Sequence, residues 1–505
     1  HLEQLAQETA QAGKFLEQRL TIYPEYTRQS RQWLDPAVRP AVLKLSDAEG
    51  FAKRDSWSPG EEQPLPVLEA TLLNQAPLNQ AATTAALDIK ELVARCVAKI
   101  ALTEAELARL LQSRGPDFAY VCRAADALRQ EVNGEVVTYV VNRNVNYTNV
   151  CSFKCQFCAF SKGKHSEDLR GDPYDISAEE LARRCQEAWQ RGATEVCLQG
   201  GIHPDYTGQT YLDILRTIRA AAPGLHIHAF SPLEVWQGAA TLGITLDEFL
   251  YRLRAAGLDT LPGTAAEVLH DEVRAELCPD KLTSAQWLAV MEAAHRAGFK
   301  TTATLMYGHI EEPRHWAAHL VAIRELQRKT GGFTEFVPLP YVHMEAPLYR
   351  KGRSRKGPSF REAVLLHAVA RLALHGVIGN IQTSWVKMGR AGVAACLNAG
   401  ANDLGGTLMN ESITRAAGAE HGQEWPPQEM ERLIHSLGRS PRMRTTLYQD
   451  APAERRAAAF AAAPLEAMRN AAAGKYQRGK LLLVSEDVIA LTPSSACGGG
   501  LGWGQ

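Results

Sequence analysis

The spacing of apolar residues divides the chain into a helical part and a part in which strands and helices alternate. From Thr83 to about Asn133, apolar residues recur every three or four positions, which is typical of amphipathic helices. Thr103 and Glu106 form a Thr-x-x-Glu capping box at the start of one of these helices. From residue 136 onward, short β-branched runs alternate with amphipathic stretches. That alternation predicts parallel strands joined by right-handed helical crossovers.

The repeated strand and helix unit predicts the fold class of this part. Helix start signals at Ser177, Thr245 and Thr283, each with Glu or Gln three residues later, separate the strand candidates. We expect an α/β fold, a (β/α) barrel of TIM type that is complete or partly open. A doubly wound sheet also fits, but the number of similar units and the lack of a Gly-x-Gly-x-x-Gly motif favour the barrel. The clearest strand candidates are VTYVV, TEVCLQ, LHIHAF, FKTTATLM and FTEFVPL, with weaker ones near LDTL, VIGNI and ANDL.

Composition and pattern divide the chain into four regions. Residues 1–66 are rich in Pro, Arg and aromatic residues without a period and end in the linker-like stretch EEQPLP. Residues 67–135 form the helical lead-in, and residues 136–448 form the barrel. Residues 449–505 are a C-terminal extension, Ala-rich and then Gly-rich, to which we assign no role. Because the chain begins with His1 rather than Met, we expect that the amino terminus of a longer protein is missing.

The charge balance and hydropathy exclude several classes of function. Lys and Arg number 55 against 56 Asp and Glu, so no excess positive charge is available to hold nucleic acid. Hydrophobic residues make up 45% and charged residues 22%, values typical of globular proteins rather than disordered ones. No apolar run reaches the roughly 18 residues of a membrane span, and the first residues lack a secretory signal. We therefore expect a cytoplasmic protein that binds neither nucleic acid nor membrane.

Three of the ten cysteines form a tight cluster that indicates metal chemistry. Cys151, Cys155 and Cys158 follow the first barrel strand, which places them on a loop at the carboxyl edge of the barrel. Three thiolates suit zinc, copper(I) or an iron–sulfur cluster. Structural zinc usually takes four ligands, and although no second Cys-x-x-Cys exists, His165 or His203 could complete a zinc site. A four-iron cluster on three cysteines instead leaves one iron open for a ligand.

The cysteine motif resembles the signature of the radical S-adenosylmethionine superfamily. The pattern Cys-x-x-x-Cys-x-Phe-Cys includes Phe157, and the superfamily's Gly-Gly after the second strand matches Gly200 and Gly201. The resemblance implies that the three cysteines hold one [4Fe-4S] cluster, whose open iron chelates S-adenosylmethionine. It also implies that reductive cleavage of this cofactor yields an adenosyl radical. Glu234 and Thr264 are further candidate contacts to S-adenosylmethionine, although helix capping explains each of them equally well.

Longer strings resemble the CofH module of FO synthase over about residues 83–448. They include NVNYTNVCSFKCQFCAFSKG, CLQGGIHP, HAFSPLEV, TLMYGHIEE, FVPLPYVH and GANDLGGTLMNESITRAAGA. The earlier stretch YPEYTRQSRQWLDPAVRPAVL resembles the carboxyl end of the CofG module in proteins where the two modules are fused. We therefore interpret residues 1–66 as a remnant of an upstream CofG-like module with its linker. As such a remnant, the segment is expected to be dispensable for the reaction of the barrel.

The resemblance implies a transferase that cleaves L-tyrosine and joins its 4-hydroxybenzyl group to 5-amino-6-(D-ribitylamino)uracil. This reaction belongs to the biosynthesis of the deazaflavin FO, the precursor of coenzyme F(420). The implied partners are a CofG-type radical module and an electron donor. An aminofutalosine-type radical enzyme of menaquinone biosynthesis, and a structural zinc or electron-carrying iron–sulfur protein, remain open as alternatives. Polar side chains at predicted strand ends are candidate substrate contacts, although a structural hydrogen bond explains each equally well: Gln199, His203, Tyr307, His309, His343, Asn410 and Glu411.

Overall fold

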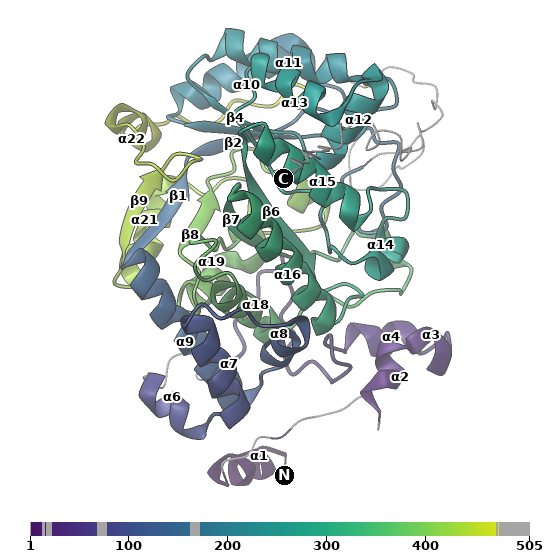
Figure 1. Cartoon of the computed structure of the whole chain (residues 1–505), viewed down its shortest axis with the longest axis vertical. Coiled ribbons are helices and arrows are strands. Elements are labelled where there is room, and N and C mark those ends of the chain that lie inside the picture. Colours follow the sequence, from purple (N-terminus) through teal and green to yellow (C-terminus); the bar gives the residue numbers. More distant parts are fainter. Residues whose placement is uncertain are drawn as a thin grey trace, which may run out of the picture.

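The computed structural model of the chain is built around parallel β-strands surrounded by helices (Figure 1). It describes residues 2–12, 16, 23–67, 78–161, 172–470 and 473. One sheet has the order β2-β3-β4-β5-β6-β7 and the other β8-β1-β9, and every ladder in both is parallel. The strands are β1 (Val136–Val140), β2 (Asn142–Asn146), β3 (Glu195–Gln199), β4 (His226–Ala229), β5 (Thr260–Leu261), β6 (Lys300–Tyr307), β7 (Phe333–Pro340), β8 (Asp403–Gly406) and β9 (Ser440–Arg444).

Short bridges join the two sheets into a barrel. Only Val141 separates β1 from β2, so the two strands are one extended segment that takes part in both sheets. At the other edge, bridges between Phe336 and Ile381 and between Gln382 and Asp403 connect β7 to β8. Because the chain alternates strand and helix with parallel pairing throughout, the predicted (β/α) barrel of TIM type is confirmed. The connection through residues 381–382 consists of single bridges rather than of a continuous ladder.

Helices cover the outside of the barrel, and the expected start signals cap them. Ser177 and Thr245 each accept a hydrogen bond from the backbone three residues later, and Thr283 forms a full capping box. The helices after successive strands are α10 (Ala178–Gln190), α11 (Gly208–Ala221), α12 (Pro232–Leu242), α13 (Leu246–Ala255), α14 (Asp271–Leu277), α15 (Ser284–Arg296), α16 (Pro313–Thr330), α17 (Pro347–Arg350), α18 (Phe360–Ala373), α19 (Trp385–Leu397), α20 (Ile413–Ala416) and α21 (Pro427–Ser436).

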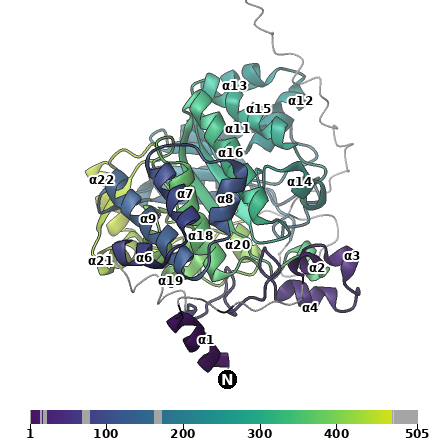
Figure 2. The same ribbon diagram turned by 60° about the horizontal axis from the view of Figure 1, so that its bottom comes forward.

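The helical lead-in forms an outer layer over part of the barrel. It comprises α6 (Leu78–Thr84), α7 (Leu87–Val97), α8 (Glu104–Leu111) and α9 (Gly115–Asn133). Every residue of α18 is buried, because α8 and α9 cover the side of this helix that faces away from the strands (Figure 2). The capping box predicted for Thr103 and Glu106 opens α8. The lead-in is therefore packed onto the barrel as part of one core.

Part of the N-terminal region packs tightly on the barrel. It contains α1 (Leu2–Gln11), α2 (Pro24–Arg28), α3 (Ser30–Trp33) and α4 (Arg39–Lys44), followed by residues 46–63, which we call the N-terminal strap. The Trp57 side chain is 2% exposed and meets the Phe360 ring edge-on, with 5.2 Å between centroids. Asp47 lies 2.7 Å from the Arg114 guanidinium. The strap thus contributes to the core.

The C-terminal extension continues the described structure only as far as residue 473. Its first part forms α22 (Ala453–Phe460), and the Arg455 guanidinium lies 3.8 Å from the centroid of the Trp189 ring. The stretch KLLLV at residues 480–484, which is apolar and suits a short strand, and the Gly-rich tail lie outside the described residues. Among the helices that the structure describes, none is both long enough and apolar enough to cross a membrane.

Candidate functional site

The three clustered cysteines line one cavity at the carboxyl end of the strands. This upper cavity has a volume of about 250 Å³. Its walls include Cys151, Cys155 and Cys158 from the loop after β2, and glycines from the end of β3. Of the candidates for a fourth zinc ligand, His203 does not appear in this wall, and His165 lies outside the described residues. Three soft donors in one cavity suit an iron–sulfur cluster with one open coordination position.

Backbone contacts fix the cysteine loop against β3 and α14. The Cys151 Sγ accepts a hydrogen bond from the Ile202 N–H at 3.3 Å, and the Ser152 N–H donates to the Ile202 carbonyl at 2.8 Å. The Gln156 N–H donates to the Leu277 carbonyl at 2.9 Å. Burial raises the pKa of Cys151 to about 11, so this thiol holds its proton until a metal displaces it.

The glycines after β3 let the cysteine loop approach the strand. A Cβ added to Gly201 would overlap the Val150 carbonyl, one residue before the first cysteine. A Cβ added to Gly200 would overlap the Tyr147 ring. The Gly201 N–H also donates to the Thr148 carbonyl at 2.9 Å. The paired glycines are therefore a packing requirement of the loop as well as part of the cavity wall.

A lysine and an aromatic ring lie beside the cysteines. The Lys281 Nζ is 2.9 Å from Glu267 Oε1 and 5.1 Å from the centroid of the Phe157 ring. All three side chains line the upper cavity. The positive charge of Lys281 acts on Cys155, whose pKa is nevertheless raised by burial. A cation at this position favours the thiolate form that metal binding requires.

The two other candidate cofactor contacts also line the upper cavity. Glu234 caps α12, because its Oε2 accepts from the Ser231 N–H at 2.7 Å, and its Oε1 accepts from the Tyr147 hydroxyl. The Thr264 Oγ1 is buried and has no hydrogen-bond partner among the described residues. A buried orphan hydroxyl, a glycine cradle and three thiols together fit a polar cofactor bound to a metal cluster.

A second cavity of about 240 Å³ lies inside the barrel, below the first. We call it the lower cavity; the two share Gln199, Thr264, Thr304, Leu339, Lys387, Ile413 and Thr414. Its polar wall includes Glu195, His228, Glu335 and Arg444. Burial lowers the pKa of His228 to about 4 and raises that of Glu335 to about 7. Arg444 lies 2.6 Å from Asp403 and 3.3 Å from Glu335, so its charge is balanced by two buried carboxylates.

The candidate substrate residues divide into two groups. Gln199 lines both cavities and Glu411 lines the lower one. The other five do not appear in either wall. His309 lies 2.6 Å from the buried Glu311, and His343 packs edge-on against Tyr349. The Tyr307 hydroxyl donates a hydrogen bond to the Ala363 carbonyl. The Asp205 N–H donates to His203 Nδ1, and the Arg143 guanidinium donates to Asn410 Oδ1.

Several cavity residues escaped the sequence analysis. Lys281, Glu267, Lys387, Glu335 and Arg444 are charged and line a cavity wall. Lys387 was detectable in principle, as a single lysine within the otherwise largely apolar run SWVKMG. Arg444 and Glu335 lie far apart in sequence, so only the folded barrel brings them together.

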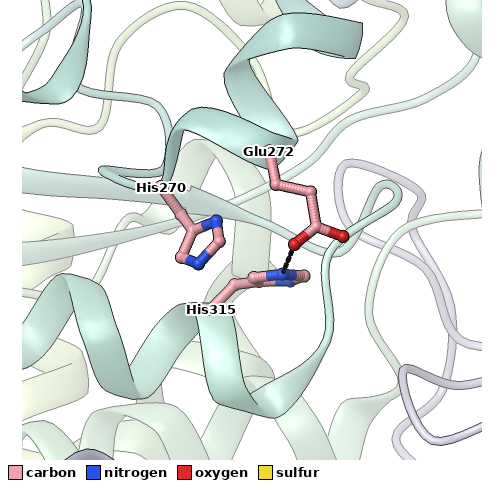
Figure 3. Close-up of side chains that lie close together, drawn as sticks. All are labelled: His270, Glu272 and His315. Atoms are coloured by element: carbon pink, nitrogen blue, oxygen red, sulfur yellow. Dashed lines mark ion pairs between the residues drawn. The ribbon is translucent and has the colours of Figure 1, made fainter.

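A second cluster of possible ligands lies outside the barrel, where His270, Glu272 and His315 face one another (Figure 3). Its hydrogen bonds do not fit a metal ion. The Glu312 N–H donates to His315 Nδ1 at 2.9 Å, so the neutral ring carries its proton on Nε2, the atom that would have to bind the metal. Arg314 donates to both Glu272 oxygens, at 3.0 and 3.1 Å. This cluster is therefore interpreted as the cap of α16.

Two family models match the chain on either side of residue 325. The radical SAM superfamily model matches residues 145–322, which include the cysteine loop and the Gly-Gly pair. The model of the CofH/MqnC C-terminal region matches residues 330–456.

Curated relatives fall into a longer and a shorter class. FO synthase of Streptomyces coelicolor is 42% identical over 493 residues, covering 91% of this chain and 56% of its own length. FO synthase of Mycobacterium tuberculosis H37Rv is 42% identical over 88% of this chain and 56% of its own length. The chain thus spans only about half the length of these proteins. The 5-amino-6-(D-ribitylamino)uracil–L-tyrosine 4-hydroxyphenyl transferase of Methanopyrus kandleri is 50% identical over 65% of this chain and 88% of its own length.

Solved structures agree on the fold. HydG, a maturase of the [FeFe]-hydrogenase, superposes with a TM-score of 0.56 at 17% identity, over 75% of this chain and 82% of its own. Methylornithine synthase (PylB) gives a TM-score of 0.54 at 17% identity, over 69% of this chain and 97% of its own. At these identities the likeness concerns the barrel alone.

Proposed function

The chain belongs to the radical SAM superfamily and, within it, to the family of CofH-type enzymes, and we propose that it is a tyrosine-cleaving transferase. It breaks the Cα–Cβ bond of L-tyrosine, joins the 4-hydroxybenzyl group to C5 of 5-amino-6-(D-ribitylamino)uracil, and releases the Cα half, which keeps the nitrogen and the carboxylate, as an imine. The observation that carries this proposal is the 50% identity to a transferase of that name over 88% of its length. The product is an intermediate on the way to the deazaflavin FO and to coenzyme F(420).

The cysteine loop is assigned the cofactor. Cys151, Cys155 and Cys158 would hold one [4Fe-4S] cluster, and Phe157 and Lys281 form the wall beside it. When bound, the cluster and S-adenosylmethionine supply a radical able to abstract hydrogen from the amino group of tyrosine. The chain binds and orients these groups and keeps them away from water.

The residues opposite the cysteines would orient S-adenosylmethionine. Gly200 and Gly201 line the upper cavity, and because the Tyr147 ring and the Val150 carbonyl fill the positions that a Cβ would take, these two residues would meet the ligand through backbone groups alone. The orphan Thr264 hydroxyl offers one hydrogen-bonding group. The Glu234 carboxylate is already engaged by Ser231 and Tyr147, so its main role is to fix the start of α12 beside the ligand.

The lower cavity is assigned to the ribitylaminouracil. A ribityl chain carries several hydroxyl groups, and the wall offers carboxylates, amides and an imidazole that can bond to them. Gln199 and Glu411 are the two candidate contacts from the sequence that lie in this wall. Of the wall groups, Glu195 Oε1 already accepts from Asn142 Nδ2 at 2.8 Å, which fixes its orientation. His203, Tyr307, His309, His343 and Asn410 would act indirectly, by supporting the barrel around the site.

Further partners complete the proposed pathway. A CofG-type radical module would close the ring to FO, and an electron donor would reduce the cluster. The cysteines that the structure describes outside the loop are free thiols, as expected in a reducing compartment such as the cytoplasm.

A product assay tests the proposal. Under anaerobic reduction with L-tyrosine, ribitylaminouracil and S-adenosylmethionine, the chain is expected to form the 4-hydroxybenzyl adduct together with 5′-deoxyadenosine and methionine. Adding an intact CofG-type protein should then give fluorescent FO. The Cys155→Ala variant should form none of these products. Bound zinc without acid-labile sulfide, or deoxyadenosine release that depends on an enolpyruvyl substrate instead of tyrosine, would refute the assignment.

A further inference from the structure

The charged groups in the two cavities are nearly all paired with a neighbour. Lys281 pairs with Glu267 at 2.9 Å, and Arg444 pairs with Asp403 at 2.6 Å. The other carboxylates accept hydrogen bonds from fixed groups. Glu195 accepts from Thr446 at 2.7 Å, and Glu411 accepts from the Thr414 N–H at 2.7 Å. Buried charges are normally satisfied in this way, because an unpaired one is costly to remove from water.

Lys387 is the exception among these cavity side chains. It lies in the first turn of α19 and lines both cavities, so it stands where they join. Its ammonium makes no hydrogen bond or ion pair with any residue in the described part of the chain; the carboxylates of Glu411 and Glu267 act on it only at longer range. Burial accordingly lowers the pKa of Lys387, against the opposing effect of these two carboxylates.

The backbone around Lys387 is held in place from outside the barrel. The Gly60 N–H of the N-terminal strap donates to the Lys387 carbonyl at 2.7 Å, and the Trp385 indole donates to the Gly406 carbonyl at 2.9 Å. The backbone position of the lysine is therefore fixed, and its side chain lines a space large enough for a ligand. Such an arrangement calls for an anionic group on the ligand.

We propose that the ammonium of Lys387 binds the α-carboxylate of the amino-acid substrate at the junction of the two cavities. This inference rests on the proposed function, in which that substrate is L-tyrosine. Held there, tyrosine places its amino group near the upper cavity and its benzylic carbon toward the lower one, where the acceptor ring is assigned. Lys387 is in this sense a residue that selects amino acids over amines.

S-adenosylmethionine also carries an α-carboxylate, so Lys387 could bind either the carboxylate of the cofactor or that of the substrate. The position of Lys387 in the cavities distinguishes between these two ligands. At the cysteine loop, the open iron of a cluster held by Cys151, Cys155 and Cys158 would take the carboxylate of the cofactor. Lys281 is the cation next to those cysteines, because its Nζ lies 5.1 Å from the centroid of the Phe157 ring in the cysteine loop, whereas Lys387 also lines the lower cavity, which Lys281 does not. The lysine at the cavity junction is thus left for the substrate.

Equilibrium binding tests this proposal without turnover. The cluster-loaded protein, with S-adenosylmethionine but no reductant, is titrated with L-tyrosine and with tyramine, which lacks the carboxylate. Wild type should bind tyrosine more tightly than tyramine. The Lys387→Met variant should lose on the order of 10-fold to 100-fold in affinity for tyrosine, as expected for one charge-assisted hydrogen bond, while its affinity for tyramine is unchanged.

Two further variants make the outcome decisive. Lys387→Arg keeps the charge and should recover part of the affinity for tyrosine. Lys300→Met is the matched control, because the exposed Lys300 contacts the Gly331 carbonyl at the opposite end of β6. A cooperative thermal transition of Lys387→Met verifies that the variant is folded. Its melting temperature should not be lower than that of wild type, because the change removes a buried cation.

The failures are distinguishable. Weakened binding of S-adenosylmethionine by Lys387→Met, with tyrosine binding intact, would assign the lysine to the cofactor and overturn the inference. Equal tyrosine affinity in wild type and Lys387→Met would do the same. If wild type binds no tyrosine at all and forms no tyrosine adduct, the proposed function itself fails.

Discussion

Some residues around the cysteine loop both line the upper cavity and hold the loop in place. Gly201 forms part of the cavity wall, yet its lack of a side chain is also what lets the Val150 carbonyl lie against the end of β3. Cys151 is held in the same place by the Ile202 N–H. A change that pushes the strand end and the loop apart therefore moves a metal ligand.

Replacing Gly201 tests this coupling. In Gly201→Ala, the added Cβ would overlap the Val150 carbonyl, so the cysteine loop must shift. We expect the iron bound per chain after anaerobic reconstitution to fall several-fold, with a lower melting temperature as well. Gly379→Ala is the matched control, because its Cβ would approach only Val132, at 3.9 Å. Full iron content in Gly201→Ala would show that the loop tolerates the displacement.

The same scale shows why some site residues were predictable and others were not. The cysteines, Phe157 and the Gly-Gly pair sit in short contiguous strings, so the sequence alone indicates their position on one loop and one strand end. Arg444 gains its meaning from Asp403 and Glu335, which only the folded barrel brings next to it, and the position of Lys387 where the two cavities join is likewise a property of the fold. The predicted His309 lies outside both cavities, with its Nδ1 2.6 Å from the buried carboxylate of Glu311, a partner only two residues away.

At the level of elements, the sequence predicts the start of a helix correctly where the capping residues lie in or next to the first turn of that helix. Thr103, Ser177, Thr245 and Thr283 all cap the helices expected from the sequence. Strands were harder to place, because the ladder of β5 contains only Thr260 and Leu261, and β8 joins β7 only through single bridges. Their positions depend on neighbouring strands rather than on their own residues.

Helix α16 contains a histidine that should make the barrel sensitive to acid. His319 is fully buried, its Nδ1 accepts from the Leu269 N–H at 3.0 Å, and burial lowers its pKa to about 3. The unfolded chain takes up this proton near the ordinary pKa of about 6.5, whereas the folded chain does not. The contribution to stability is therefore present above about pH 6.5 and is lost as the pH falls toward 3.

The His319→Gln variant isolates this effect. Between about pH 6 and about pH 4.5, wild type should lose about 2 kcal/mol more unfolding free energy than His319→Gln, as measured by urea denaturation. The exposed His435 on α21 provides the control, because His435→Gln should follow the wild-type pH dependence. Parallel curves for wild type and His319→Gln would mean that the folded protein accepts the proton after all.

On the scale of the whole molecule, the barrel, the helical lead-in and the N-terminal strap form one packed body. The sequence suggested that residues 1–66 are a dispensable remnant of another module, and their origin stays a prediction. The strap residues within this segment, however, pack into the core and are expected to stabilise the fold. Burial alone would raise the pKa of Asp47, but Arg114 and Arg361 hold it below its usual range. The strap also reaches the active cavities, through the hydrogen bond from Gly60 to the Lys387 carbonyl.

Two truncations and one point variant separate the strap from the residues before it. A chain that begins at Pro24 should melt like the full chain, because it keeps every contact of the strap. A chain that begins at Val67 loses the Asp47 ion pairs and uncovers Phe360, so we expect a much lower melting temperature or no cooperative transition. Trp57→Ala, which leaves the backbone of the strap in place, should cost about 3–5 kcal/mol of unfolding free energy. If the chain from Val67 instead melts cooperatively at the melting temperature of the full chain and forms the adduct at the same rate, the strap is dispensable for folding and activity, as expected from the sequence.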